Sequence, residues 1–324
     1  MKAIAQTVYG SADVLELREL AQPTIGPGEV LVEVRAAGVG PGVWIAMTGR
    51  PWGVRVAFGL TRPKVPVRGR ALAGVVAAVG ASVTGFEPGD EVYGTSSTGT
   101  FAEYVAAQPR RLARKPARLS FAQAAAVPIS GVTALEAVRD GARVQPGQKV
   151  MVIGAAGGIG SFMVQIAKAY GATVTGVCGT DKVELVRSLG VDDVIDYSRA
   201  EVDRDGGVYD VILDTAGCRP LPLLRRALTP RGTLVIVGGG HDAPGPVGGY
   251  TRQMRVPFVS LFTSQRLVGL TSKERGATLD DLARLIDDGK VTPVIHRTYP
   301  LAEAAEAIRY VAGGHAAGKV VVTV

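Results

Sequence analysis

The stretch VMVIGAAGGIGSFMVQIAKAYGA at residues 150–172 decides the fold class of this chain. It starts with a short apolar run, Val150 to Ile153, typical of a buried strand, and a glycine-rich turn follows. The rest carries apolar side chains at helical spacing, at Phe162, Met163, Ile166 and Ala167. A strand, a glycine turn and a helix in this order are the context that a dinucleotide-binding βαβ unit requires.

The turn itself matches the dinucleotide fingerprint GxGxxG at two of three positions, because Ala155 stands where the first glycine is usual. Gly157 would let a pyrophosphate approach the backbone, and Gly160 would let helix and strand pack closely. Amides near the positive end of the helix would hold the phosphates. We therefore assign the whole turn to cofactor binding: Ala155, Ala156, Gly157, Gly158, Ile159 and Gly160. The alternative is a tight strand-to-helix turn without a ligand.

The end of the next strand indicates which nicotinamide cofactor binds. NAD-binding units usually place Asp or Glu there to bind the ribose hydroxyls, whereas this strand ends in Cys178 and Gly179. Thr180 can donate a hydrogen bond and Lys182 supplies positive charge, so both suit the 2′-phosphate of NADPH. Asp181 would favour NADH if its side chain turned inward. The sequence thus predicts NADPH, with NADH as the alternative.

The sequence on either side of this unit divides the chain into two parts. The first hundred residues read as short strands and turns, with valine-rich runs at 29–39, 73–80 and 90–94. From about residue 121 helical and strand patterns alternate, with buried strands expected at 209–217 and 232–240. Apolar strands separated by helices predict an α/β fold with a Rossmann-type, doubly wound parallel sheet.

Composition restricts the possible function classes. The chain has 324 residues, 47% hydrophobic and 20% charged, which suits a globular protein long enough for two domains. We expect a cytoplasmic protein without a membrane partner, since we find neither a secretory signal nor an uninterrupted apolar span. The net charge of +7 and the basic run at 110–118 do not predict a nucleic-acid partner, because the stretch 108–119 that contains the run has two prolines and no nucleic-acid motif. We interpret it as a solvated linker.

Motifs spread over nearly the whole chain carry a family resemblance. They are AAGV at 36–39, GDEVYG at 89–94, GTFAEYV at 99–105, AAAVPISGVTALEAV at 124–138, the glycine turn and the closing GKVVVTV at 318–324. With these motifs the sequence resembles the medium-chain dehydrogenase/reductase superfamily, in its zinc-independent quinone-oxidoreductase and enoyl-reductase branch. The resemblance implies a GroES-like catalytic domain at 1–122 and 294–324, a Rossmann domain at 123–293, and an active site in the cleft.

The resemblance also implies roles for single residues. Thr133 would lie near the nicotinamide ribose, with a catalytic as well as a binding role, and Tyr197 near the adenosine phosphate. The nicotinamide half would be lined by Ala216, Gly217, Val237, Gly238 and Gly239, and Lys319 joins the cofactor-binding set. A homodimer joined through sheet edges near residues 266–273 is expected. The plain alternatives are a helix cap for Thr133, a core position for Tyr197 and strand-end turns for the glycines.

Zinc-binding residues are missing from the positions where zinc-dependent relatives carry them. Those relatives have Cys near AAGV and a His-Glu pair near the following strand, whereas this chain has Gly40, Arg70 and Ala71 there. The three histidines are dispersed, so we predict no metal site. Without a Lewis acid to stabilise an alkoxide, reduction of an already polarised acceptor is the better hypothesis.

The substrate pocket is expected to be apolar. We assign Gly40, Trp44, Met47, Trp52 and Phe262 to it, although such side chains are often core, and Tyr93 is a possible proton source. The leading hypothesis is hydride transfer from NADPH to the activated double bond of an apolar enone, quinone or enoyl-type molecule. Two alternatives stay open: a zinc-free carbonyl or alcohol oxidoreductase, and a redox-silent scaffold that acts as a biosynthetic cyclase or binding protein.

Overall fold

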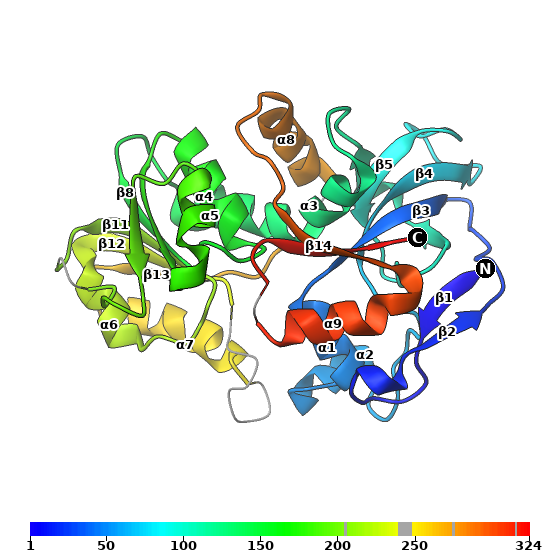
Figure 1. The fold of residues 1–324 in the computed structure, drawn as a ribbon, viewed down its shortest axis with the longest axis horizontal. Coiled ribbons are helices and arrows are strands. Elements are labelled where there is room, and N and C mark those ends of the chain that lie inside the picture. The colour runs from blue at the N-terminus through cyan, green and yellow to red at the C-terminus, as the bar shows by residue number, and fades with distance from the viewer. Residues whose placement is uncertain (204–205, 239–247, 274–275, 315) are drawn as a thin grey trace. The chain divides into compact units, whose positions relative to one another are not determined.

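The computed structural model divides the chain into two compact units, which we describe separately (Figure 1). It describes residues 1–203, 206–238, 248–273, 276–314 and 316–324. The first unit comprises Met1–Val132, Glu274–Asp287 and Pro293–Val324, and the second comprises Thr133–Lys273 and Asp288–Thr292.

This division differs from the predicted boundaries at 122/123 and 293/294, because residues 123–132 and 274–287 belong with the first unit. The second of these segments contains helix α8 (Gly276–Asp287), which the sequence pattern attached to the preceding Rossmann segment. The carbonyl of Leu279 on α8 accepts a 2.8 Å hydrogen bond from the buried Tyr93 hydroxyl. Such a tertiary contact between residues 186 apart leaves no signal in a local pattern.

A six-stranded parallel sheet forms the centre of the second unit, in the order β10-β9-β8-β11-β12-β13. Its strands are β8 (Lys149–Ile153), β9 (Thr173–Cys178), β10 (Asp193–Asp196), β11 (Tyr209–Asp214), β12 (Leu228–Ile236) and β13 (Arg266–Gly269). Their residues are mainly β-branched or leucine, and the central strands β8, β9 and β11 are buried almost throughout. The predicted Rossmann-type parallel sheet is confirmed.

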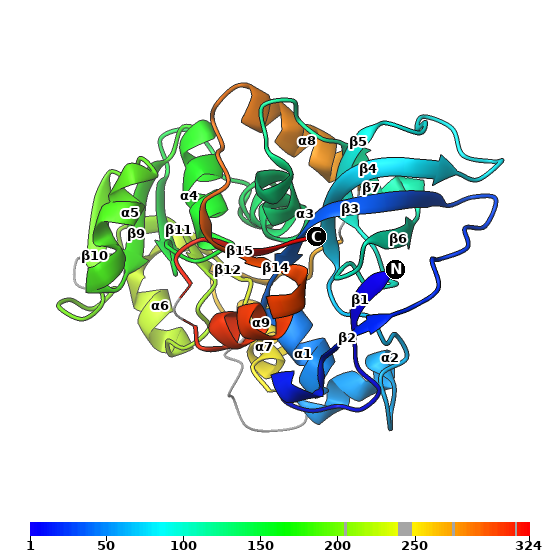
Figure 2. The ribbon, with the colours of Figure 1, turned by 45° about the vertical axis from the view of Figure 1, so that its right-hand side comes forward.

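Helices cover both faces of this sheet. From β8 the chain passes through α4 (Gly160–Ala169) and α5 (Val183–Ser188) toward one edge, and from β11 it passes through α6 (Leu221–Ala227) and α7 (Tyr250–Ser260) toward the other. Figures 1 and 2 show α4 and α5 on one side of the strands and α6 and α7 on the opposite side. Right-handed crossovers in two directions from the middle of a parallel sheet require this arrangement. The carboxyl ends of β8 and β11 lie at the point where the direction reverses.

A long buried helix precedes the sheet: α3 (Phe121–Leu135), continued by a π-helical segment, η4 (Glu136–Ala142). In the part of the chain that the structure describes, this helix is the one long and apolar enough to cross a membrane by length and composition. Its most apolar window is 78% buried inside the protein, as in the core helix of a globular domain.

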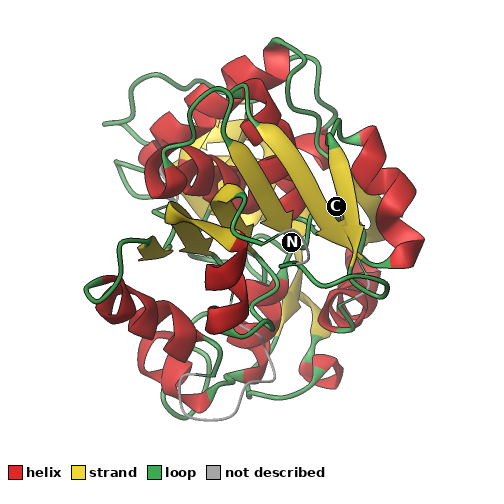
Figure 3. Cartoon of the chain, turned by 90° about the vertical axis from the view of Figure 1, so that its left-hand side faces the viewer, coloured by secondary structure: helices red, strands yellow, loops and turns green. Residues whose placement is uncertain are grey.

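The first unit contains a seven-strand sheet, in the order β14-β15-β3-β4-β5-β7, with β6 also paired to β3. Its strands are β3 (Val30–Val39), β4 (Ala71–Val79), β5 (Glu91–Thr95), β6 (Tyr104–Ala107), β7 (Leu112–Arg114), β14 (Ile295–Pro300) and β15 (Lys319–Thr323). A separate pair joins β1 (Lys2–Ala5) to β2 (Glu16–Glu19), and the helices are α1 (Pro41–Thr48), α2 (Arg55–Phe58), α8 and α9 (Ala304–Ala312). The C-terminal strand β15 pairs antiparallel with β3, so the chain end returns to the first unit as expected, and both termini lie there (Figure 3).

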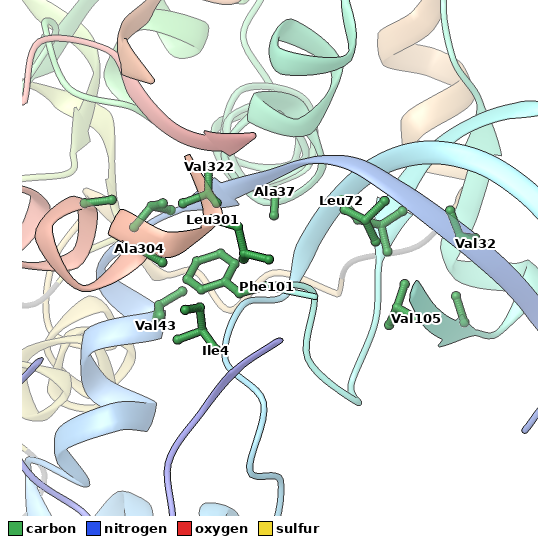
Figure 4. Packing of buried hydrophobic residues seen from close by; sticks show 14 of the residues in the cluster. Ile4, Val32, Ala37, Val43, Leu72, Phe101, Val105, Leu301, Ala304 and Val322 are labelled. Carbon is green, nitrogen blue, oxygen red and sulfur yellow. The ribbon is translucent and has the colours of Figure 1, made fainter. Parts of the chain in front are cut away.

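Phe101 lies at the centre of the core of this unit and is fully buried. Figure 4 shows its ring among Ile4 and Val43 from the start of the chain and Leu301 and Ala304 from the end. Burial of one such ring contributes about 1.5–3 kcal/mol to folding. The two distant segments are thus joined through one apolar cluster.

The basic run at 110–118 is not the solvated linker that we expected. It forms a 3-10 turn and strand β7, and its side chains bind within the unit. Arg118 donates hydrogen bonds to the carbonyls of Ile286 and Asp287 at the C-terminal end of α8. A cation there offsets the negative end of the helix dipole, so the charge stabilises the fold.

Candidate functional site

The glycine turn after β8 is shaped by three glycines with different roles. Gly154 adopts a left-handed conformation with φ of 80°, and a Cβ there would lie 2.4 Å from the Thr215 hydroxyl. A Cβ on Gly160 would lie 2.0 Å from the Gly154 carbonyl oxygen, so the first residue of α4 packs directly against the backbone of the turn. A Cβ on Gly157 would meet only that oxygen, at 3.2 Å, and otherwise points into open space. The sequence analysis missed Gly154, whose signal was its place directly before the fingerprint.

The turn leaves backbone donors available for an anion. Among the described residues, the amides of Gly158 and Ile159 have no acceptor, and no side chain caps the start of α4. These amides lie at the positive end of a ten-residue helix, where phosphate oxygens bind favourably. The open space at Gly157 lies beside them. A dinucleotide diphosphate therefore fits the residues present.

The end of β9 carries neutral groups, as predicted, but Thr180 has a different partner. Cys178 is buried, and burial raises the pKa of its thiol to about 11, so the strand end is uncharged at neutral pH. The Thr180 hydroxyl donates a 2.7 Å hydrogen bond to Asp196 at the end of β10. It is thus engaged, rather than free to donate to a 2′-phosphate as we expected. The Asp181 carboxylate lies beside Gly179, with its Oδ1 3.1 Å from where a Cβ would be.

Tyr197 and Arg219 add an aromatic ring and a cation next to this strand end. Tyr197 is 55% exposed, so the core alternative is wrong, and its hydroxyl lies 2.9 Å from a Cβ position on Gly179. The guanidinium of Arg219 lies over the Tyr197 ring, 5.6 Å from its centroid. Lys182 directly precedes α5, close by in sequence, and is partly exposed. The sequence analysis missed Arg219, because only the fold brings it beside Tyr197.

The residues assigned to the nicotinamide half follow β11 and β12. Asp214 is fully buried, and its Oδ1 accepts hydrogen bonds from the amides of Ala216 and Gly217, each 3.1 Å long. Its Oδ2 accepts a 2.8 Å hydrogen bond from Arg252 on α7. This buried ion pair holds the loop after β11 to α7.

The loops after β11 and β12 are also held together through their backbones. The amide of Val237 donates to the Asp214 carbonyl, and a Cβ on Gly238 would lie 2.4 Å from the Thr215 carbonyl oxygen. Gly239 lies outside the described residues. Thr133 is 7% exposed and lies within α3 rather than at its start, so it does not cap the helix.

Tyr93 is not a proton source in this structure, which corrects the sequence hypothesis. Its side chain is fully buried, and its hydroxyl donates to the Leu279 carbonyl. Burial, reinforced by the nearby carboxylates of Asp280 and Asp287, raises the pKa of Tyr93 well above its usual range. The side chain acts as a tether between β5 and α8.

The predicted apolar pocket is only partly in place. Met47 is 1% exposed and belongs to the core, so it cannot line a pocket, and Trp44 packs against the same core. Trp52 is 66% exposed on the short turn η2 (Trp52–Val54), and Gly40 precedes α1. Phe262, directly after α7, is 89% exposed in the second unit. Helical spacing did not reveal that the Met47 side chain lies in the core of the unit.

A cavity of about 290 Å³ lies within the first unit instead, between residues 42 and 111. None of the five residues predicted for the substrate pocket lines it. Its wall includes apolar side chains such as Val43 and Phe58, together with basic residues of the segment at 64–70. This size is at the lower limit of about 300–1,000 Å³ usual for small-molecule sites.

Lys319 has an unusual environment. Its side chain is buried, its Nζ donates a 3.0 Å hydrogen bond to the Val39 carbonyl, and it lies 3.6 Å from the Cβ position on Gly40. Burial lowers the pKa of this amine to about 8. The structure places Lys319 against β3 in the first unit, and its assignment to the cofactor stays a prediction.

Replacing Lys319 should change how stability depends on pH. The folded chain disfavours the ammonium form, so the cost of burying it is present below about pH 8 and disappears as the pH rises toward 10.5. Relative to Lys319→Met, the native chain should gain on the order of 1–3 kcal/mol of unfolding free energy over that range. Urea unfolding at several pH values would measure this difference. The exposed Lys2 supplies the control Lys2→Met. If the unfolding free energies of the native chain and of Lys319→Met change in parallel with pH, the lowered pKa of Lys319 is contradicted.

The donor set for zinc does not fit. Gly40, Arg70 and Ala71 stand at the positions where zinc-dependent relatives carry ligands, and none of them offers a thiolate, imidazole or carboxylate. Within the described ranges, no three His, Cys, Asp or Glu side chains lie close enough together to hold a metal ion. His241 and His315 lie outside those ranges.

Two family models match the chain. The alcohol dehydrogenase GroES-like domain matches residues 26–117, and the zinc-binding dehydrogenase model matches residues 189–322. The first lies within the first unit, and the second covers the later part of the parallel sheet and the C-terminal strands.

Curated relatives and solved structures match over nearly the whole chain. The NADPH-dependent alkenal/one oxidoreductase of Arabidopsis thaliana, a chloroplastic protein, is 35% identical over 99% of this chain and 79% of its own length. The 2-methylene-furan-3-one reductase of Solanum lycopersicum is 34% identical, with the same coverage. The quinone oxidoreductase structure from Coxiella burnetii has a TM-score of 0.85 at 28% identity, covering 100% of this chain and 99% of that one.

Proposed function

Because this chain belongs to the medium-chain dehydrogenase/reductase superfamily, in the branch of quinone oxidoreductases and enoyl reductases, we propose that it is an NADPH-dependent oxidoreductase. Its acceptor is an activated double bond, in an enone, a quinone or an enoyl-type molecule. The observation that carries the proposal is the glycine turn, with open space at Gly157 beside two amides that lack acceptors in the described chain. Two relatives named for alkenal or furanone reduction support the acceptor class.

The chain's own residues would bind and orient the reactants. When bound, NADPH supplies the hydride. Amides of the turn at 154–160 hold the diphosphate, and the loops after β11 and β12, fixed by Asp214, define the nicotinamide half. A preorganised donor toward the acceptor oxygen can contribute several kcal/mol to such a reaction. Tyr93 does not supply it, because its hydroxyl is engaged with Leu279.

A substrate panel tests the proposal. We expect the purified chain to consume NADPH, followed by its absorbance, with enones and quinones, and more slowly or not at all with simple aldehydes. Consumption with aldehydes alone would favour the zinc-free carbonyl reductase. Tight NADPH binding without consumption on any acceptor would overturn the reductase and favour the redox-silent scaffold.

Lys182→Ala should weaken binding of NADPH more than binding of NADH. A charge-assisted contact to the 2′-phosphate is worth about 1–2 kcal/mol, so the dissociation constant for NADPH should rise about tenfold while that for NADH barely changes. Fluorescence titration with both cofactors measures this. The control is Lys149→Ala, because Lys149 is an exposed lysine at the opposite end of β8. Equal losses for both cofactors would rule out the role of Lys182.

The active assembly is proposed to be a homodimer formed through the second unit. Strand β13 lies at one end of the sheet order, so one of its edges has no strand partner among the described residues. Helix α7, which packs on β13, exposes the apolar side chains of Met254 and Phe258, and Leu261 and Phe262 follow it. Light scattering should give twice 33.6 kDa, and a single-chain mass would contradict the proposal. Met254→Asp with Phe258→Asp should yield the monomer.

The location in the cell is proposed to be cytoplasmic. The support is the sequence expectation alone, and several relatives are named as chloroplastic or mitochondrial. Fractionation of the source cells, with the chain detected by antibody, tests this, and recovery in an organelle or membrane fraction would contradict it.

A further inference from the structure

The cavity in the first unit is lined by an unusual number of cations. Four basic residues contribute to its wall, Lys64, Arg68, Arg70 and Arg111. The described part of the chain adds no acidic residue to the lining. The remaining wall is glycine, serine and apolar side chains. The charges of Arg68 and Lys64 on this wall attract a negatively charged group.

Arg68 is the central observation. Its side chain belongs to a residue that is 5% exposed, and it makes one hydrogen bond among the described residues, from Nη1 to the Ala46 carbonyl at 3.1 Å. Its Nε has no partner within those residues, and no carboxylate forms an ion pair with it there. Burial lowers the pKa of this guanidinium to about 10. An unpaired buried cation is costly, which a bound anion would relieve.

The backbone holds Arg68 and Arg70 in place. Gly69 between them has φ of 88°, a left-handed conformation, and a Cβ there would lie 2.4 Å from the Thr100 hydroxyl. The Arg68 amide donates to the Ile4 carbonyl, and its own carbonyl accepts from the amides of Thr100 and Phe101. This segment is therefore rigid before any ligand arrives. A preorganised cation loses little entropy on binding.

Apolar surface adjoins the cationic wall. Helix α2 contributes Ala57 and Phe58 to the cavity. On the same helix and the residues around it, Trp52, Val56 and Leu60 are each at least 66% exposed. A ligand with a charged end and an apolar body matches this pairing of surfaces, because the body can cover side chains that otherwise face water.

We propose that the acceptor substrate of this enzyme carries an anionic group, a carboxylate or a phosphate, which Arg68 and Lys64 bind in the first-unit cavity. The proposal rests on the proposed reductase function and specifies its substrate class as amphiphilic acids rather than neutral apolar molecules. The cationic cavity takes the place of the apolar substrate pocket that the sequence predicted.

Kinetics with matched neutral and charged acceptors provide the test. We would use an oxononenoate, a straight-chain enone with a terminal carboxylate, and its methyl ester, each with saturating NADPH. The acid should show a KM about tenfold lower than the ester, as expected for one charge-assisted contact. Equal KM values with both compounds reduced would overturn this inference and leave the proposed function intact. Reduction of neither would overturn the proposed function.

Variants of the cavity residues test whether the cavity causes the lower KM of the acid. Arg68→Met should raise the KM of the acid about tenfold and leave that of the ester unchanged, and Arg68→Lys should restore part of the preference. Lys64 is exposed, so Lys64→Met is expected to fold even if Arg68→Met does not. It should raise the KM of the acid by a smaller factor than Arg68→Met. Arg62→Met is the control, since Arg62 is an exposed cation of the same segment that does not line the cavity. A loss in the control equal to that in Lys64→Met would contradict the site.

A direct binding measurement tests the cavity without any reaction, and it distinguishes a carboxylate from a phosphate as the bound anion. Calorimetric titration with octanoate, octyl phosphate and octanol requires no reaction. Binding of octanoate or octyl phosphate, at least about tenfold tighter than octanol and lost in Arg68→Met, supports the site and identifies the anion. Binding of octanol as tight as that of both anions overturns it.

Discussion

Gly157→Val is expected to abolish the binding of NADPH while the second unit stays folded. A Cβ at this position meets only the Gly154 carbonyl oxygen, at 3.2 Å, so the side chain extends into the space beside the open amides. A diphosphate that needs close approach to the backbone would clash with it. We expect the dissociation constant for NADPH to rise by about a hundredfold or more, since several charge-assisted contacts are lost together. Fluorescence titration measures the loss, and urea unfolding monitors the fold.

Gly160→Val is the matched comparison within the same turn. Its Cβ would lie 2.0 Å from the Gly154 carbonyl oxygen and 2.9 Å from the Ala155 Cα, both backbone atoms that cannot move aside cheaply. The expected result is a loss of about 1–3 kcal/mol or more in the free energy of unfolding, because the start of α4 is forced away from β8. Unchanged NADPH titration in Gly157→Val, or equal destabilisation by both variants, would refute the geometry of the turn.

Asp214→Ala should be strongly destabilising. Its buried carboxylate binds Arg252 and the amides of Ala216 and Gly217, so removal leaves a guanidinium and two amides without their partner. Removing one partner of a buried ion pair costs about 3–5 kcal/mol. Urea denaturation should show this loss, with weaker NADPH binding in the remaining folded protein.

A double-mutant cycle distinguishes the ion pair from its surroundings. Arg252→Met removes the cation, whose side chain is 18% exposed, and the double variant should recover part of the loss seen in Asp214→Ala. The exposed pair between Arg187 and Glu184 is the control, for which Glu184→Ala should change stability by less than about 1 kcal/mol. A loss in Asp214→Ala as small as in the control would show that this pair does not hold the loop.

Sequence patterns located the loops assigned to the cofactor better than the residues assigned to the substrate pocket. The glycine turn, the neutral strand end at Cys178 and the loops after β11 and β12 all follow from local order, because each directly continues a strand. The substrate half depends on which side of a helix or strand faces a cavity. For that reason Met47, predicted to line a pocket, lies in the core, and Arg68 was not noticed.

The sequence by itself determined the fold class, the parallel arrangement of the strands in the second unit and the placement of the glycine turn. These follow from apolar periodicity and from backbone conformations that only certain residues adopt, which are local properties of the chain. Only the tertiary structure decided that Tyr93 tethers α8, that Thr180 binds Asp196 and that the Nε of the buried Arg68 has no hydrogen-bond partner among the described residues. Hydrogen-bond partners and burial depend on which distant segments meet, and the energy of a charge is set by those surroundings rather than by its neighbours in sequence.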